Sequence, residues 1–214
     1  MTKLERWIVW GYTKPGYCAW AAVLPSGKIH IVSEWLFRET VASDVAKEIL
    51  DRTRDVTALL VAKRHDVRNG KSVGSSDMWP KEDAEYTEST AGMFAKQKLA
   101  LTRGSENRLG GWQRLRHWLR LAPDFSPWLQ LSASCTYALR TLPFLIADAD
   151  NPEDLPMKGE NDQVATALRI GVMARPTPTI LKAQPPIMLA DSIKALATDM
   201  EPGRFIRRPM GMVS

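Results

Sequence analysis

Three short apolar segments follow one another near the start of the chain, and they limit the fold more than any other feature. They are residues 6–10, 17–24 and 28–35, and the third is rich in the β-branched side chains typical of strands. Pro25-Ser26-Gly27 lies between the last two and is typical of a turn, because proline presets φ and glycine closes the turn. Connections this short join antiparallel neighbours, so we predict a three-stranded antiparallel meander.

Helices and strands are expected to alternate over the rest of the domain. Apolar residues recur at helical spacing in five segments, which are residues 41–54, 87–97, 107–121, 135–142 and 160–173. Residues 127–131 are expected to form a strand, and residues 63–74, which are basic and contain glycine, a loop. Residues 57–62 fit either an extension of the first helix or a strand. A meander followed by this alternation indicates an α/β fold with a mixed sheet.

The helix predicted at 107–121 has an apolar and a basic side. The residues expected to face the core are Leu109, Trp112, Leu115, Trp118 and Leu119. Arg114, Arg116 and Arg120 are expected outside.

Composition is that of a globular protein. Of 214 residues 44% are apolar, which is enough for a core, and the net charge of +5 is compatible with a polyanionic partner. Cys18 and Cys135 are far apart in apolar stretches, so we expect buried free thiols in a reducing compartment. The charged start and the lack of an apolar run of about 20 residues favour a soluble cytoplasmic protein without signal peptide or membrane span. We place a domain at residues 1–175 and a Pro-rich basic tail at 176–214.

Six short motifs follow one another in a fixed order. They are Trp10-Gly11-Tyr12 with Pro15, Ser26-Gly27 with Glu34-Trp35, Ser76-Asp77-Met78-Trp79, Asn107-Arg108-Leu109 with Gly111-Trp112, Cys135 with Arg140-Thr141-Leu142-Pro143, and the acidic helix from Glu160 to Arg169. Each is weak alone, but their common order is hard to obtain by chance.

In this order the motifs resemble the nuclease domain of the terminase large subunit of tailed phages, over roughly residues 6–175. The resemblance implies an RNase H-like fold and a place in phage or prophage DNA packaging in a bacterial host cell. It implies cleavage of double-stranded DNA by carboxylates that hold two Mg²⁺ or Mn²⁺ ions about 4 Å apart. The implied partners are a separate ATPase motor subunit, a small terminase subunit and the portal.

Two positions depart from the acids of that family. An aspartate normally stands where this chain has Val9, and another where it has Thr166. Valine cannot bind a metal ion and threonine is a poor neutral ligand. The middle acid is Asp77 if the Asp-Met-Trp motif sets the register, and is lost if Lys63 occupies that position. We therefore expect impaired cleavage, and no metal ion at all if the site is too depleted.

Other carboxylates offer partial replacement. Asp162 lies one helical turn before Thr166 and shares its side of the helix, although it also suits the helix dipole there. Glu34 ends the third strand, next to the first in the sheet, while Asp66 in a basic segment is a poor candidate. We take Asp77 and Asp162 as the candidate catalytic and metal-binding residues, and Glu34 as a further metal ligand.

Arginines are the candidate nucleic-acid contacts. Arg108 matches a family motif, and Arg114 and Arg116 lie on the basic side of their helix, which could equally be an ordinary solvated surface. Gly70-Lys71-Ser72 is similar to the end of a P-loop, but His65 stands where that motif needs its first glycine. We therefore expect no ATPase motor in this sequence, so that the motor is a separate gene product or the chain is a fragment of a split gene.

Three functional hypotheses remain. The first is a terminase nuclease-like domain with impaired metal-dependent cleavage. The second is a non-catalytic module that binds DNA or the procapsid in assembly or regulation. The third is a prophage remnant without function, from which no binding is expected. By its position, the Pro-rich tail suggests a contact with the portal.

Overall fold

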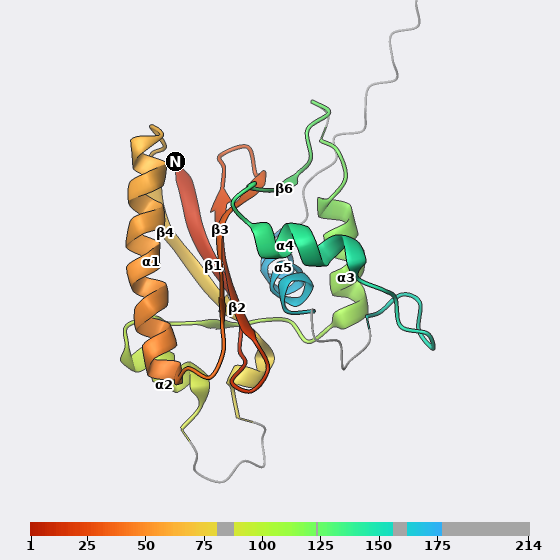
Figure 1. Ribbon diagram of the computed structural model, residues 1–214. Coiled ribbons are helices and arrows are strands. Elements are labelled where there is room, and N and C mark those ends of the chain that lie inside the picture. Colours follow the sequence, from red (N-terminus) through yellow and green to blue (C-terminus); the bar gives the residue numbers. More distant parts are fainter. Residues whose placement is uncertain (81–87, 123, 156–161, 177–214) are drawn as a thin grey trace, which may run out of the picture. The chain divides into compact units, whose positions relative to one another are not determined.

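A mixed sheet forms the centre of the structure, which is a computed structural model that describes residues 1–80, 88–122, 124–155 and 162–176. Within these residues the sheet has the strand order β5-β4-β1-β2-β3-β6 (Figure 1). Its strands are β1 (Thr2–Val9), β2 (Gly16–Val23), β3 (Ile29–Phe37), β4 (Val67–Gly74), β5 (Thr102–Arg103) and β6 (Leu129–Leu131). The helices are α1 (Ala42–Ala62), α2 (Thr90–Lys96), α3 (Arg108–Trp118), α4 (Thr136–Thr141) and α5 (Gln163–Met173), with single 3₁₀ turns η1 (Ser76–Met78) and η2 (Leu142–Phe144).

The predicted meander is confirmed. β1 pairs antiparallel with β2, and β2 pairs antiparallel with β3. β4 then lies parallel to β1 on its other side, so both strands end at the same edge of the sheet. β5 and β6 extend the sheet by parallel pairing with β4 and β3. The mixed α/β sheet expected from the sequence is therefore present.

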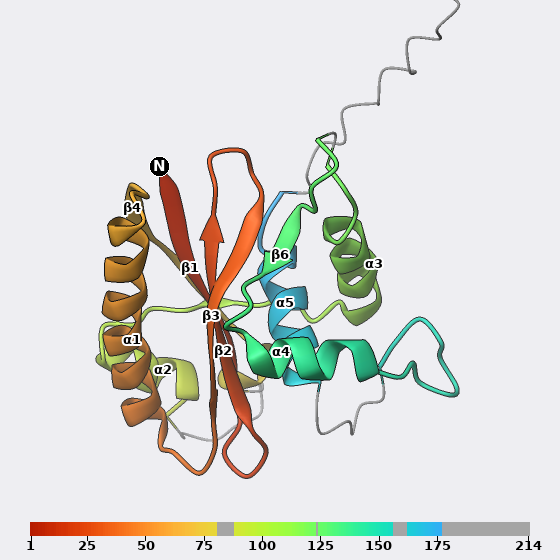
Figure 2. The same cartoon turned by 45° about the horizontal axis from the view of Figure 1, so that its top comes forward.

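Helices cover both faces of the sheet. Figure 2 shows α1 and α2 on one side, and α3, α4 and α5 on the other. Because side chains alternate along a strand, β1 contributes Ile8 to the core under α1 and Trp7 to the core under α5. Cys18 and Cys135 are buried free thiols, as predicted.

The structure overturns one local prediction and settles an open choice. Residues 63–74 do not form a loop, because Val67–Gly74 is β4. Its first half is polar and mostly exposed, so it lacks the apolar pattern of a strand, and pairing with β1 supplies the order that the side chains do not indicate. The open choice at residues 57–62 is settled as helix, since α1 continues to Ala62.

The apolar side of α3 is narrower than predicted. Trp112, Leu115 and Trp118 are buried, whereas Leu109 is 40% and Leu119 52% exposed. The three buried positions follow a spacing of three residues, so they cover a single narrow stripe of the helix.

The described residues belong to a single compact unit, and none of their helices has the length and hydropathy needed to span a bilayer. The tail at residues 177–214 lies outside the described part, so the boundary near residue 175 stays a prediction.

Candidate functional site

The candidate site lies at the edge of the sheet where β1 and β4 end. Over β1, the last helix runs antiparallel to the strand. Beyond the C-terminal end of α5, the Arg175 Nη1 donates to Glu5 Oε1 at 2.6 Å. Earlier in α5, Gly171 lies so close to Trp7 that a Cβ would be 1.9 Å from the indole Cδ2. Residue numbers thus fall along α5 as they rise along β1, and the start of α5 lies over the end of β1.

This packing brings Val9 and Thr166 to the same level. The five residues from Gly171 to Thr166 span about 7.5 Å of helix. The two residues from Trp7 to Val9 span about 6.7 Å of strand and keep the side chain on the same face. Val9 packs against the core under α5, and both residues are half-buried. The two positions at which the resemblance implies carboxylates therefore lie at a similar level along β1, and here both are neutral.

Asp162 directly precedes α5 at this same end, and its carbonyl oxygen accepts a hydrogen bond from the Thr166 N–H at 2.8 Å. Burial raises the pKa of the Asp162 carboxyl, and the positive charges of Arg108, Lys14 and Arg169 oppose that rise. The half-buried Asp162 carboxylate, at this end of the sheet, has the right chemistry for a divalent cation.

Asp77 lies in η1, just beyond the end of β4, and is exposed. Ser75 continues the pairing beside β1, because its N–H donates to the Ile8 carbonyl at 2.9 Å and its Oγ accepts from the Trp10 N–H at 3.1 Å. Lys63 is the C-cap of α1 and precedes β4, at the opposite edge of the sheet. Geometry therefore favours Asp77 over Lys63 as the acid that accompanies the end of β4.

The Glu34 carboxylate is engaged by protein donors. The Tyr17 hydroxyl donates to Oε2 at 2.9 Å, the Tyr137 N–H to Oε1 at 2.6 Å and the Ala138 N–H to Oε2 at 3.0 Å. These amides belong to the first turn of α4, so Glu34 caps that helix from β3. A metal ion at Glu34 would have to compete with all three donors.

The predicted nucleic-acid arginines divide into two groups. Arg108 donates to both carboxylate oxygens of Asp154, with its Nη2 at 2.9 Å from Oδ1. Arg114 donates to the Arg175 carbonyl at 2.5 Å. Arg116 and Arg120 are exposed. Of the three candidates, Arg116 is thus the one whose side chain is displayed to solvent without a bond to another described residue.

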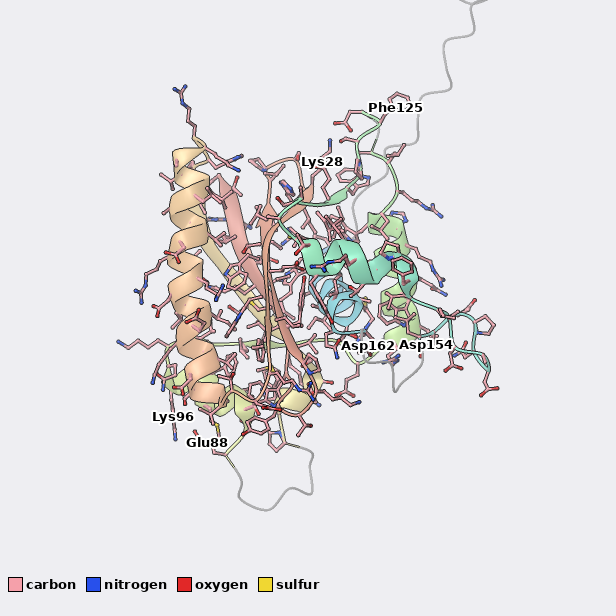
Figure 3. All side chains as sticks on the ribbon, in the orientation of Figure 1. Lys28, Glu88, Lys96, Phe125, Asp154 and Asp162 are labelled. Carbon is pink, nitrogen blue, oxygen red and sulfur yellow. The ribbon has the colours of Figure 1, made fainter. Side chains whose placement is uncertain are left out.

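Asp154 is a residue that sequence reasoning missed. Besides Arg108, it accepts from the Trp112 indole N–H at 2.6 Å. Figure 3 labels Asp154, which lies beside α3. The Arg108 guanidinium, with help from Trp112, lowers the pKa of Asp154 to about 2. Arg169 in turn stacks on Trp112, with its guanidinium 5.3 Å from the centre of the indole ring. Nothing in the sequence distinguishes Asp154 from the other acids of its polar loop.

Whether this site can hold metal ions depends on which side-chain donors are available. Among the described residues, no three His, Cys, Asp or Glu side chains gather as a metal site. Val9 and Thr166 contribute no carboxylate, and Glu34 is engaged, which leaves Asp77 and Asp162. The described residues therefore do not fit a pair of divalent ions. Glu160, at the start of the predicted acidic helix, lies outside the described part of the chain.

Comparisons with known proteins identify the fold. No protein-family model matches the sequence, and no curated protein matches it. The large terminase of a thermophilic bacteriophage, solved in complex with ADP, is similar with a TM-score of 0.59 and 13% identity. The match covers 79% of this chain and 39% of that one, so the chain corresponds to less than half of that terminase.

A second similar structure is the large terminase nuclease of the thermophilic phage G20c, solved with bound cobalt. Its TM-score is 0.52 at 12% identity, and the match covers 80% of each chain. The agreement extends over most of this chain. This chain has the RNase H-like fold of the nuclease domain of phage large terminases.

Proposed function

We propose that this chain is a nuclease-like domain of a terminase large subunit that acts on double-stranded DNA in phage or prophage packaging, with metal-dependent cleavage reduced or lost. The fold and the ordered motifs support the packaging role. A single observation supports the impairment: Val9 and Thr166 stand level at the end of β1 and the start of α5, where the resemblance implies two carboxylates.

The chemistry explains the consequence. A divalent ion in such a site activates water and stabilises charge on the phosphate, and it needs carboxylate oxygens to hold it. The cobalt in the G20c nuclease supports a metal site in this type of domain. Here Asp77 and Asp162 would supply the remaining oxygens, which suits at most one weakly held Mg²⁺ or Mn²⁺ ion.

Cleavage of supercoiled plasmid by the full chain tests the proposal. In Mn²⁺ or Mg²⁺ we expect little or no nicking above an EDTA control. The double variant Val9→Asp/Thr166→Asp should gain Mn²⁺-dependent nicking, because both positions are half-exposed and tolerate a charge. Wild-type nicking that disappears in Asp77→Ala would show that the native acids suffice, and would refute the impairment.

The second candidate is a non-catalytic module that binds DNA or the procapsid. The net charge of +5 and the exposed Arg116 and Arg120 favour it. DNA affinity that falls with salt, without cleavage, would support this role. Arg116→Ala should reduce the magnitude of the salt slope by about 0.9, the value for one phosphate contact. The matched change Arg108→Ala should instead destabilise the fold, because it leaves Asp154 without its main partner.

The partners follow from the packaging role. A separate ATPase motor, a small terminase subunit and the portal are the proteins that the chain would meet in the cytoplasm of a bacterial host. The tail at 176–214 is the proposed portal contact, on the basis of its position alone. A chain without the tail that binds the portal as well as the full chain would refute that contact.

A further inference from the structure

Arg6 is a charged side chain in the middle of β1 that is only 3% exposed. Its Nη2 donates to the Gly70 carbonyl at 2.8 Å, while its Nε has no partner in the described structure. No carboxylate of the described residues forms an ion pair with it, and its neighbour Glu5 is bound to Arg175. Burial lowers the pKa of Arg6. A buried cation is costly unless an anion or a full set of acceptors compensates it.

A β-bulge lies directly beside Arg6. The pairing of β1 with β4 shifts between Leu4 and Arg6, so that two residues of β4, Gly70 and Lys71, lie opposite the single residue Glu5. Only glycine fits at position 70, because a Cβ would lie 2.9 Å from the Leu4 carbonyl oxygen. Bulges of this kind often redirect side chains next to binding sites.

Ser72 is the partner of Arg6 in the register after the bulge, so both side chains are on the α1 face. It is 3% exposed, and its Oγ also has no hydrogen-bond partner in the described structure. Two buried polar groups therefore lie side by side with bonds unmade. Groups of this kind commonly bind an ordered water or an ion.

A cavity of about 610 Å³ adjoins Arg6 between α1, β1, β4 and the segment after α2, and we name it the Arg6 pocket. Figure 1 shows α1 lying along β1 and β4 on this side. Arg54 and Lys98 also line the Arg6 pocket, and none of the described lining residues is acidic. Arg54 is paired only with the exposed Asp51 on its own helix, so it can turn to another anion.

Lys98 lines the Arg6 pocket from a residue with an unusual backbone conformation. Its φ of 65° is the left-handed conformation that usually follows a helix as glycine or asparagine. A lysine in this conformation carries some backbone strain. The hydroxyls of Thr53 and Thr57 already donate to helix carbonyls, so the donors that remain in the pocket are cationic or, at Asn69, an amide.

We propose that the Arg6 pocket binds a phosphate-class oxyanion, on the opposite face of the sheet from the nuclease-like site. Arg6 would contribute the donors of its fork, whose geometry matches two phosphate oxygens. Lys98 and Arg54 would supply the remaining charge from the rim. The volume accepts a phosphate joined to a nucleoside, so the source is either a free phosphate compound or the DNA backbone.

Thermal unfolding of the full chain tests the site, with inorganic phosphate, deoxyadenosine monophosphate and a short DNA duplex as probes. Sodium chloride at equal ionic strength is the reference. At ten times its Kd, a bound probe should raise the Tm by about 3–6 °C over that reference. Lys98→Gly should lose most of this shift, although it relieves the strained backbone.

Arg64→Gly is the matched control. Arg64 is also a basic residue with a left-handed φ, of 63°, after a helix, but it does not line the Arg6 pocket. It should therefore keep the full shift. Equal shifts in the two variants would show that the probe acts by general screening, and would overturn the site.

The probes separate the two sources. A shift with phosphate and the mononucleotide that depends on Lys98 assigns a free ligand, and a shift with the duplex alone that depends on Lys98 assigns the DNA backbone. No shift with any probe overturns the proposal. Arg6→Met is a second variant, which should raise the Tm without probe and abolish the shift, since it removes the uncompensated charge. Cleavage activity is not measured, so the outcome is independent of the nuclease proposal.

Discussion

Glu34 joins three elements of the fold through one carboxylate, which accepts from Tyr17 in β2 and from two amides of α4. We expect Glu34→Gln to lower the free energy of unfolding by about 1–3 kcal/mol, because the amide NH₂ would oppose a backbone N–H. Urea denaturation measures this. The exposed Glu39→Gln should change it by less than about 0.5 kcal/mol. A variant as stable as wild type, but with weaker Mn²⁺ binding, would instead assign Glu34 to the metal.

For single residues, the sequence predicted which positions matter better than it predicted their hydrogen-bond partners. The motifs selected Val9 and Thr166, and the structure places them level with each other. The motifs could not reveal that Glu34 caps α4, because that contact joins residues about 100 positions apart. Asp154 was missed for the same reason, because its structural role depends on hydrogen bonds from Arg108 and Trp112, which lie in a different element. Long-range polar contacts leave no periodic pattern in a sequence.

The loop that follows η2 is fastened to α3 by Asp154, and this contact depends on pH. The folded protein holds the pKa of Asp154 at about 2, below the usual value near 3.9, so it favours the ionised form. The stabilisation is therefore complete above about pH 4 and is lost as the pH falls towards 2. Asp154→Asn should lower the Tm at pH 7 and converge with wild type near pH 2.

Calorimetry from pH 7 to pH 2 checks this convergence. Asp150→Asn in the same loop is the control, because Asp150 is exposed, and its curve should follow the wild type. A constant gap between Asp154→Asn and wild type down to pH 2 would contradict the ion pair as the cause.

The approach of α5 to β1 decides the geometry of the candidate site, and Gly171 permits it. Gly171→Ala would place a Cβ 1.9 Å from the Trp7 ring. We expect a loss of about 3 kcal/mol or more, because neither the helix nor the buried indole can move freely. Gly92→Ala in α2 is the control, since its nearest contact is the Ser89 Oγ at 3.1 Å. Chemical denaturation of both variants makes the comparison, and equal stabilities would mean that α5 can shift away from β1.

How well each helix or strand could be predicted depended on how clearly apolar residues repeat along its sequence. The strands β2 and β3 and the helices α3 and α5 follow apolar periodicities and were predicted within about three residues of their observed bounds, whereas β1 begins at Thr2, four residues before its predicted start. β4 was not, because residues Val67 to Lys71 alternate no apolar side chains. It is ordered by parallel pairing with β1, so its place depends on the sheet and not on its own composition.

For the molecule as a whole, three contacts just after α5 hold the end of that helix to the sheet and to α3. Lys71 donates to the Ala174 carbonyl, Arg114 donates to the Arg175 carbonyl, and Arg175 pairs with the buried Glu5. A chain that ends at Pro176 keeps all three contacts. We expect its Tm to stay within about 2 °C of the full chain, because the three contacts that fasten the end of α5 all lie before residue 177.

A chain that ends at Met173 is the matched comparison, because it is only three residues shorter but lacks all three contacts. Losing Arg175 leaves the Glu5 carboxylate buried with the Trp7 indole as its remaining partner. Breaking a buried pair in this way costs about 3–5 kcal/mol. Thermal unfolding of the two truncated chains separates the cases. If both are as stable as the full chain, the contacts after α5 do not hold the fold; if both are unstable, the folded unit extends beyond residue 176.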